Sequence, residues 1–216
     1  MRNFDRSKRI VIKIGTATLS ADGDVDTKYV RQLAKQVASL VKDGRQVLII
    51  SSGAIGMGAG QLEIDSKISA IKMRQACAAI GQPMLMQEYR QAFKRYSVTI
   101  AQVLVTAEVL NQRKTYLNLQ NSIETLLKLG VVPVLNENDS VSTDEIGTAF
   151  GDNDTLSALV ASKVDADLLI MLSDIDGLYT KDPRKHKDAE PVSMVFEIDE
   201  NIIRGAGTSG SKHATG

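Results

Sequence analysis

Two carboxylates, Asp152 and Asp154, flank the amide of Asn153 in the segment "GDND" at residues 151–154, and an apolar run follows directly. One Asp or Asn at this place would be an ordinary helix cap. Three polar side chains after a glycine are more than a cap requires. The segment therefore indicates that at least one carboxylate has a role beyond the helix.

Lys13 interrupts an apolar run in the stretch "KIGTATL" at residues 13–19. A lysine in a buried strand costs free energy unless a negative group meets it. It either snorkels from an edge strand to water or faces the phosphate groups of a ligand. In the second case, the turn at Gly15 and Thr16 supplies backbone N–H groups to the same phosphates.

A glycine-rich stretch, "SSGAIGMGAG" at residues 51–60, follows another predicted strand. Its four glycines allow the backbone to approach a ligand closely and to adopt positive φ angles. The spacing matches neither the dinucleotide-binding pattern G-x-G-x-x-G nor the phosphate-binding pattern G-x-x-x-x-G-K-[ST]. A plain turn between a strand and a helix is the alternative, so this stretch alone does not identify a site.

Acidic and amide side chains follow two later predicted strands. The stretch "NENDSVST" begins with residues 136–139, which place two carboxylates and two amides at the carboxyl end of the sheet. A solvated acidic loop is the alternative for any one of them. The stretch "SDIDGLYTKDPR" at 173–184 contains the pairs 176–177 (Asp-Gly) and 182–183 (Asp-Pro), which are typical of turns.

These stretches together favour phosphoryl transfer, which depends on positioning and charge neutralisation more than on covalent chemistry. No arrangement of serine, histidine and aspartate suggests itself. The two histidines, His186 and His213, lie in polar segments where we expect them to be exposed. Neither they nor Cys77 shows the spacing of metal ligands. We expect Cys77 to be a small core residue on a helix.

The composition excludes several classes of protein. The 216 residues carry 26 Lys plus Arg and 26 Asp plus Glu, so no global positive field attracts nucleic acid. The single cysteine excludes an internal disulfide and fits a reducing compartment. The N-terminal apolar run is too short for a signal peptide, and no stretch has the length of a membrane span. We expect a cytoplasmic protein that binds neither nucleic acid nor membranes.

Short β-branched runs alternate with longer helical patterns along the chain. The runs are apolar almost throughout, as strands covered on both faces are. This alternation predicts an α/β fold, a three-layer αβα sandwich with a mainly parallel sheet and ligands at the carboxyl ends of its strands. We predict strands at 9–14, 46–51, 98–105, 131–136 and 167–173, with a short one near 194–198. We predict helices at 26–43 (capped by Asp26 and stopped at Gly44), 67–80, 83–95, 113–129 and 153–164.

Five stretches taken together closely resemble the amino acid kinase family in their order and spacing, through essentially the whole chain. Aspartate, carbamate and uridylate kinases share the lysine strand and the glycine loop. The combination of "NEND" with "GDND" is specific to the branch of the family that acts on glutamate. The five stretches are "VIKIGTATL", "SSGAIGMG", "VVPVLNENDSV", "GDNDTLSALVA" and "LLIMLSDIDGLYTKDPR".

The resemblance implies ATP-dependent phosphorylation of the side-chain carboxylate of L-glutamate to an acyl phosphate, the first step of proline biosynthesis. By the family's motifs, Lys13 would stabilise the transferring phosphoryl group and Asp154 would fix active-site lysines. The implied substrate-binding residues are Ser52, Gly53, Ala54, Asp139, Asp152 and Asn153, with an aspartate accepting from the ammonium group of glutamate. The implied nucleotide-binding residues are Lys13, Gly15, Thr16, Ser173, Asp174, Thr215 and Gly216.

The implied reaction needs little else from the protein. Mg²⁺ would be held mainly by the ATP phosphates, so we expect no protein metal site. A glutamate side chain has a pKa of about 4 and is already ionised at neutral pH. No general base is therefore required, which agrees with the absence of a candidate histidine.

The family continues with a glycine-rich segment that contains a second lysine, and here Ala214, Thr215 and Gly216 match its start. We therefore expect one kinase domain, 1–216, that is incomplete at its C-terminus and lacks the PUA domain of some members. The family also implies a homo-oligomer, a dimer or tetramer, and feedback inhibition by proline. The missing lysine leaves a non-catalytic glutamate- or nucleotide-binding module as the alternative. A nicotinamide-dependent oxidoreductase fails on the glycine spacing.

Overall fold

The structure is a computed structural model of the chain, and it describes residues 4–21, 24–64, 66, 68–141, 153–200 and 202–203. The described residues divide into two compact units, one that runs to Leu172 and one that begins at Ser173. The named helices and strands below all belong to the first unit.

Five parallel strands form the sheet of the first unit. β1 (Arg9–Ile14) pairs with β4 (Gln46–Ile50) on one side and with β7 (Leu168–Leu172) on the other. β6 (Val132–Glu137) pairs with β4, and β5 (Ile100–Val105) pairs with β6. The order β5-β6-β4-β1-β7 confirms the five long predicted strands and brings their carboxyl ends to one end of the sheet.

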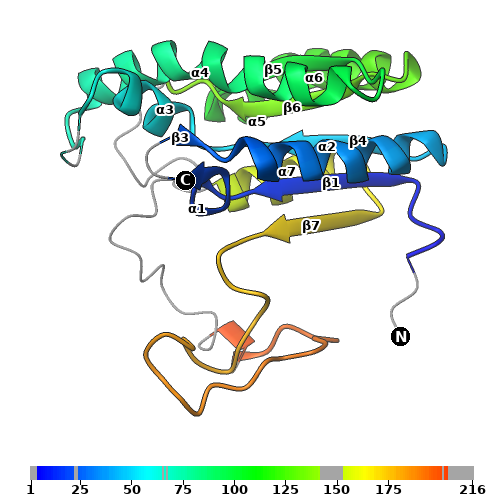
Figure 1. The fold of residues 1–216 in the computed structure, drawn as a ribbon. Helices are drawn as coiled ribbons and strands as arrows, with labels where there is room; N and C mark the ends of the chain where they lie inside the picture. Colours follow the sequence, from blue (N-terminus) through cyan, green and yellow to red (C-terminus); the bar gives the residue numbers. More distant parts are fainter. Residues whose placement is uncertain are drawn as a thin grey trace. The chain divides into compact units, whose positions relative to one another are not determined.

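Helices cover both faces of this sheet, which confirms the predicted three-layer αβα sandwich (Figure 1). α2 (Thr27–Lys42) and α4 (Ile71–Lys94) pack on one face. α6 (Arg113–Lys128) and α7 (Asn153–Lys163) pack on the other. Among the described residues, no helix combines the length and the apolar character needed to cross a membrane.

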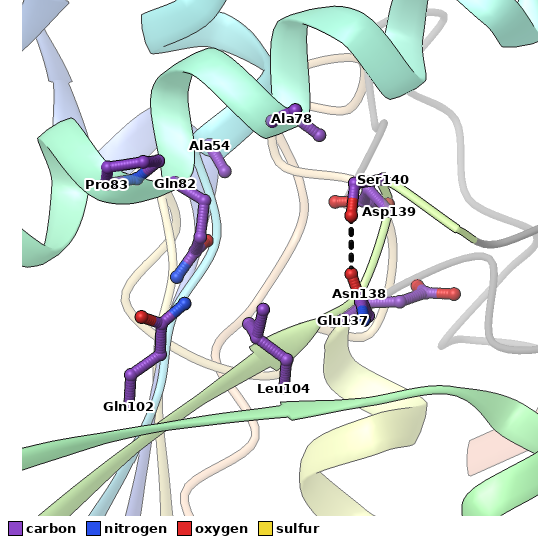
Figure 2. Close-up of a pocket in the computed structure, with 11 residues that line it drawn as sticks. Ala54, Ala78, Gln82, Pro83, Gln102, Leu104, Glu137, Asn138, Asp139 and Ser140 are labelled. Carbon is purple, nitrogen blue, oxygen red and sulfur yellow. Dashed lines mark hydrogen bonds between the residues drawn. The ribbon is translucent and has the colours of Figure 1, made fainter.

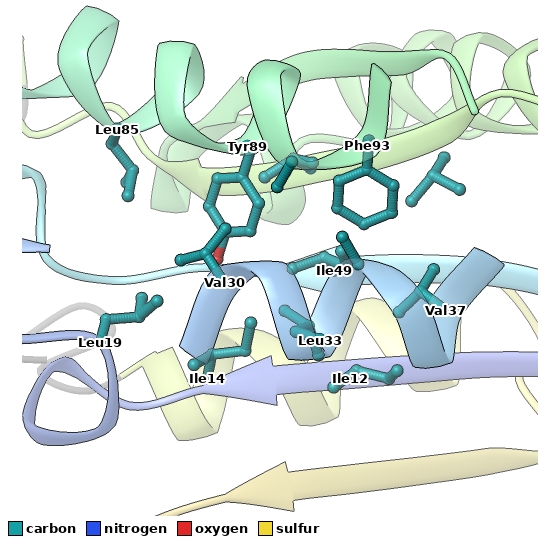
Figure 3. Close-up of a cluster of buried hydrophobic side chains, with 14 of the residues drawn as sticks. Ile12, Ile14, Leu19, Val30, Leu33, Val37, Ile49, Leu85, Tyr89 and Phe93 are labelled. Carbon is teal, nitrogen blue, oxygen red and sulfur yellow. The ribbon is translucent and has the colours of Figure 1, made fainter. Parts of the chain in front are cut away.

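Side chains of β1 alternate between the two apolar cores, as successive residues of a strand do. Ile10, Ile12 and Ile14 enter the core beneath α2 and α4, whereas Val11 enters the core beneath α6 and α7. Lys13 lies two residues after Val11 and therefore on the face that α7 covers. Figure 3 shows the first of these cores, with Leu19, Val30, Leu33, Val37, Ile49, Leu85, Tyr89 and Phe93.

α2 begins and ends where the sequence predicts. The Asp26 side chain caps it by accepting from the N–H groups of Lys28 and Tyr29 at 2.9 and 3.0 Å. Gly44, with a φ of +79°, follows the last turn in the left-handed conformation. The predicted caps are therefore confirmed at both ends.

The region between β4 and β5 corrects two predictions. Most of the glycine-rich stretch forms α3 (Ala54–Gln61) instead of a loop. The helices predicted at 67–80 and 83–95 are one helix, because α4 continues through Pro83. Proline usually interrupts a helix because it cannot donate to the carbonyl group four residues before it. Here α4 packs along α3 and the sheet on both sides of Pro83, which stabilises the helix across this position.

Glycines allow α3 and α4 to pack with their backbones in contact. A Cβ on Gly58 would lie 1.9 Å from the carbonyl oxygen of Cys77, and one on Gly81 would lie 1.9 Å from that of Ala54. Gly53 precedes α3 with a φ of +94°, a conformation that favours glycine. Part of the glycine pattern thus serves a turn and helix packing. Cys77 is free and buried, as predicted.

Short elements escaped the sequence patterns because they span too few residues for a periodic signal. They are α1 (Thr16–Leu19), α5 (Ala107–Asn111) and the small sheet of β2 (Ser20–Ala21) with β3 (Asp24–Val25).

The second unit contains turns in place of regular strands. The strand predicted near 194–198 is wrong, because these residues pair with no strand in the described part of the chain and are exposed. The predicted turn after Asp182 is confirmed, and the Asp182 carboxylate accepts from the Arg184 N–H at 3.0 Å. An isolated antiparallel bridge joins Tyr179 to Pro191.

Candidate active site

Lys13 and Asp154 form an ion pair at the carboxyl end of the sheet. The Lys13 side chain is 8% exposed, whereas the Asp154 side chain is 41% exposed. Asp154 lies in the first turn of α7, which covers this face of β1. An edge-strand lysine that reaches water is therefore excluded, because β1 is flanked by β4 and β7. A buried ammonium group held by a half-exposed carboxylate is placed to meet a second anion.

The turn after β1 begins with a backbone hydrogen bond to the neighbouring strand. The Gly15 N–H donates to the Leu172 carbonyl oxygen at 3.0 Å and continues the pairing of β1 with β7. The Gly15 N–H is therefore bonded within the sheet, and its role toward a phosphate stays a prediction. A Cβ on Gly15 would lie 3.5 Å from Lys13 Nζ, so the missing side chain keeps space open beside the ammonium group. Thr16 follows as the first residue of α1.

A buried hydroxyl faces the same space. Thr18 Oγ1 lies 3.8 Å from the position of that Cβ and has no hydrogen-bond partner among the described residues. Its O–H group can donate to an anion beside Lys13.

The loop after β4 begins with two buried serines. Ser51 and Ser52 are both buried, and Ser51 Oγ lies 2.9 Å from the hydroxyl group of Tyr89 on α4. Burial raises the pKa of Tyr89, so its phenol stays protonated at neutral pH. Gly53 then turns the chain, and Ala54 begins α3. Because the first N–H groups of a helix have no partner within it, this start of α3 offers backbone donors.

Side-chain amides connect α7, the loop after β4, the end of β6 and α4 beneath the carboxyl end of the sheet. Asn153 Nδ2 of α7 donates to the Ser51 carbonyl oxygen at 2.9 Å and to Ser52 Oγ at 2.7 Å. It also lies 3.5 Å from Asn136 Oδ1 at the end of β6. Asn136 Nδ2 donates to Gln82 Oε1 of α4 at 2.8 Å. The predicted residues Asn153 and Ser52 thus contact each other, and a ligand would meet Asn153 through its Oδ1 atom.

A pocket of about 250 Å³ opens beside this network (Figure 2). α4 contributes Gln82 to one wall, and the loop after β6 contributes Asp139 to another. The volume is below the range of about 300–1,000 Å³ typical of drug-sized ligands, so the pocket suits a small metabolite. Of the predicted substrate-binding residues, the pocket contains Ala54 and Asp139.

Asp139 lies in the acidic part of the pocket. Burial, together with the neighbouring Glu137 carboxylate, raises the pKa of Asp139 to about 6, against an opposing effect of Arg74. Most Asp139 side chains are therefore ionised at neutral pH. A partly desolvated carboxylate beside a like charge is stabilised by a cation, so this part of the pocket favours an ammonium group.

Hydrogen bonds within the loop support this acidic part. Ser140 Oγ donates to Asn138 Oδ1 at 2.7 Å (Figure 2). The N–H of Asn138 donates to the Val105 carbonyl oxygen at 2.8 Å, which extends the pairing with β5 beyond β6. The loop therefore leaves the sheet with a defined conformation.

Two predicted nucleotide-binding residues belong to the second unit. There the Ser173 hydroxyl donates to the Asp174 carboxylate at 3.1 Å, and Arg184 pairs with Asp174 at 3.0 Å. Arg184 also pairs with Asp182 at 3.4 Å. His186, in the same unit, is exposed as predicted.

Three predicted site residues, Asp152, Thr215 and Gly216, lie outside the described residues, as does His213. Their roles stay predictions.

The sequence patterns miss Gln82, which the structure places in the pocket wall and in the amide network. A signal for it exists, because a polar side chain stands on the buried face of a helical pattern. Cys77, Ala78, Gln82, Leu85 and Tyr89 recur at helical spacing and are all buried. The assumed break at Pro83 hides this pattern.

Within the described ranges, no group of three or more His, Cys, Asp and Glu side chains is arranged to hold a metal ion. The hydrogen-bond donors at this place are the ammonium group of Lys13 and the hydroxyl group of Thr18. Such donors suit phosphate oxygens better than a cation.

The sequence of the chain is similar to those of known proteins. The model of the amino acid kinase family matches residues 8–215. A glutamate 5-kinase of Methanosarcina mazei is 50% identical over 207 residues, which cover 92% of this chain and 54% of the relative. A glutamate 5-kinase of Streptococcus uberis is 46% identical over 218 residues, which cover 100% of this chain and 81% of the relative.

A third relative, a glutamate 5-kinase of Caldanaerobacter subterraneus subsp. tengcongensis, is 46% identical over 209 residues, with 96% of this chain and 56% of the relative covered. The chain spans about half the length of the Methanosarcina mazei and Caldanaerobacter relatives.

Proposed function

The chain belongs to the amino acid kinase family, and from this premise we propose that it transfers the terminal phosphoryl group of ATP to the side-chain carboxylate of L-glutamate. The Lys13–Asp154 ion pair, joined through Asn153 to a small pocket with an acidic part, carries the proposal. The relatives named glutamate 5-kinase support this choice of substrate.

The proposed reaction forms one P–O bond and breaks another. A carboxylate oxygen of glutamate attacks the terminal phosphorus of ATP, and the bond to the bridging oxygen of ADP breaks, which yields an acyl phosphate and ADP. The Lys13 ammonium group neutralises charge on the transferring phosphoryl group. Asp154 holds that ammonium group in place. The nucleophile is already ionised at neutral pH and needs no base.

The rest of glutamate would lie toward the pocket. Asp139 and the Oδ1 atom of Asn153 would accept from its ammonium group, and Asp152 would join them, as the family motif implies. Ser52, Gly53 and Ala54 would contact the substrate from the loop after β4. Burial of the serines in this loop and its bond to Asn153 support a preorganised substrate site.

The nucleotide would be bound on the other side of Lys13. The open space at Gly15, the turn at Thr16 and the Thr18 hydroxyl would face its phosphates. Ser173, Asp174, Thr215 and Gly216 are proposed nucleotide contacts from the family motifs. Mg²⁺ would be held by the phosphates of ATP, where it neutralises their charge.

A direct assay tests the proposal. The chain is incubated with Mg-ATP and L-glutamate, and the acyl phosphate is trapped with hydroxylamine as a coloured hydroxamate. We expect glutamyl hydroxamate and an equal amount of ADP, with little product from L-aspartate, whose carboxylate is one methylene closer to the ammonium group. Absence of hydroxamate and of glutamate-dependent ADP would contradict the proposal. Glutamate binding without turnover would favour the binding-module alternative.

Two further expectations rest on the family resemblance alone, namely assembly into a dimer or tetramer and feedback inhibition by proline. A cytoplasmic location is a third expectation, and it rests on the composition of the sequence. Size-exclusion chromatography with light scattering tests the first, and the hydroxamate assay with added proline tests the second.

A further inference from the structure

Gln82 carries a buried amide nitrogen whose hydrogen-bonding capacity is not used. The residue is 8% exposed and lines the pocket. Its Nε2 atom has no hydrogen-bond partner among the described residues. A buried donor without an acceptor is destabilising, and few such groups persist in proteins without a functional or solvent partner.

The orientation of this amide follows from its neighbours. The Glu137 backbone N–H donates to Asn136 Oδ1 at 3.0 Å, which turns Asn136 Nδ2 toward α4. Asn136 Nδ2 then donates to Gln82 Oε1 at 2.8 Å. Reversing the Gln82 amide would bring two N–H groups together, so Oε1 stays with Asn136 and Nε2 is left for the pocket. Figure 2 shows this amide extending from α4 toward the side of the pocket where Gln102 lies.

The charges of the pocket indicate the ligand group that Nε2 would meet. Asp139 and Glu137 make one part of the pocket acidic and suited to an ammonium group. Gln82 provides a neutral donor to the pocket. It belongs to the wall that α4 forms, whereas the two carboxylates belong to the wall at the end of β6. A molecule with an ammonium group and a carboxylate on the same carbon matches both groups.

We propose that Gln82 is a substrate-binding residue whose Nε2 group donates to the α-carboxylate of the amino acid. The inference rests on the proposed function, which places the side-chain carboxylate at Lys13 and leaves the α-carboxylate to the pocket. Asn136 acts as a positioning residue, because its amide fixes that of Gln82.

Binding of matched ligands to the full chain tests this assignment by isothermal titration calorimetry. L-Glutamate carries all three charged groups, 4-aminobutyrate lacks the α-carboxylate, and glutarate lacks the ammonium group. Gln82→Glu keeps the shape of the side chain and the acceptor for Asn136 but replaces the donor by an acceptor. We expect the Kd of L-glutamate and of glutarate to rise about 10- to 100-fold. The Kd of 4-aminobutyrate should stay within about threefold.

Two control variants separate the donor from other effects. Gln82→Met introduces no charge and should raise the Kd of L-glutamate about tenfold. Gln91→Met removes an exposed amide of α4 that does not line the pocket and should change that Kd less than about threefold, because this side chain faces water. Thermal unfolding followed by circular dichroism confirms that each variant is folded.

The outcomes distinguish this inference from the proposed function. Unchanged L-glutamate binding by both Gln82 variants overturns the role of Gln82 alone. An equal loss for L-glutamate and 4-aminobutyrate indicates a merely structural role and also overturns it, as does an equal loss for Gln91→Met. If the unmodified chain binds no L-glutamate, the proposed function fails, and the inference fails with it.

Discussion

The two ends of β1 each carry a cation on the same face of the sheet, and their surroundings differ. At the amino end, the Arg9 guanidinium donates to Glu124 at 2.6 and 3.1 Å and to Gln46 at 2.9 Å. It also donates to the Val164 carbonyl oxygen. Arg9 therefore ties β1 to β4, α6 and the segment that follows α7.

The same end is closed by backbone hydrogen bonds as well. The Asp167 carboxylate accepts from the N–H groups of Arg9 and Lys8 at 2.8 and 2.7 Å. These two bonds hold the pKa of Asp167 below its usual range. The amino end of the sheet thus pairs its charges with one another.

The carboxyl end leaves polar groups for a ligand. Lys13 pairs with a carboxylate that is 41% exposed, and the Thr18 hydroxyl and the Gln82 amide nitrogen have no partner in the part of the chain that the structure describes. The comparison shows that the surroundings of a charge, more than its place on a strand, separate a structural cation from a candidate catalytic one.

Lys13→Met should produce the largest effect on activity. It removes the ammonium group that would stabilise the transferring phosphoryl group, so we expect the kcat of the hydroxamate assay to fall at least about 10³-fold. The melting temperature should change little, because Asp154 is half-exposed and remains solvated. A kcat within tenfold of the unmodified chain would contradict the proposed role.

Arg9→Met should instead lower the stability of the chain and leave its activity unchanged. It leaves the Glu124 carboxylate and a carbonyl oxygen without their donor, so we expect a loss of about 2 kcal/mol in the free energy of unfolding in urea. The KM for glutamate should not change. Lys181→Met removes an exposed pair with Asp188 and serves as a control, with an expected loss below about 0.5 kcal/mol. Equal losses in the two variants would show that the amino-end network stabilises the chain no more than an exposed ion pair does.

Asp139 makes the carboxyl end sensitive to pH. An ammonium group binds its ionised form, so with a pKa of about 6 the KM for glutamate should rise up to about tenfold per pH unit below pH 6. Asp139→Asn should raise that KM at all pH values and abolish this dependence. A KM that stays constant from pH 7.5 to 5 in the unmodified chain would contradict the contact.

The free energy of unfolding of Asp139→Asn at two pH values should show that the pKa of Asp139 is raised in the folded chain. The folded chain binds more protons at Asp139 than the unfolded chain between pH 3.8 and about 6, so its stability falls as the pH rises through this window. Asp139→Asn should therefore stabilise the chain by about 1–3 kcal/mol at pH 7.5 and by nothing near pH 4. Urea unfolding at both pH values measures the difference.

Tyr89→Phe should have the smallest effect and would sharpen the comparison within the carboxyl end. It removes a buried hydrogen bond to Ser51 but no group that faces the pocket. We expect a loss of about 1 kcal/mol in stability and a KM and kcat within twofold of the unmodified chain. A large loss of activity would mean that the Ser51–Tyr89 bond positions the substrate loop.

Much of the fold could be predicted from local patterns. The five apolar runs became the five long strands, and the spacing of Val30, Leu33 and Val37 identified α2. The periodic signal failed where another force decided the outcome. At Pro83 the packing of α4 against α3 and the sheet outweighed the local preference of proline. In 194–198 a strand-like run found no strand to pair with among the described residues.

Part of the candidate site could also be predicted, because residues at the carboxyl ends of parallel strands share one end of the sheet. This rule placed Lys13 and Asp139 at that end, and the contact of Lys13 with Asp154 is present. The fate of the Gly15 N–H could not be predicted, because it depends on pairing with Leu172, which lies 157 residues further along the chain.

The sequence by itself determined the parallel sheet, the end at which polar groups gather and the chemical types found there, because strand periodicity and residue type are local properties. The tertiary structure decided which of those groups bond to other side chains of the protein and which are left for a ligand. Asn136 turns Gln82, α7 brings Asp154 to Lys13, and α4 closes one wall of the pocket. Each of these arrangements needs contacts between segments far apart in the chain, and no local pattern encodes them.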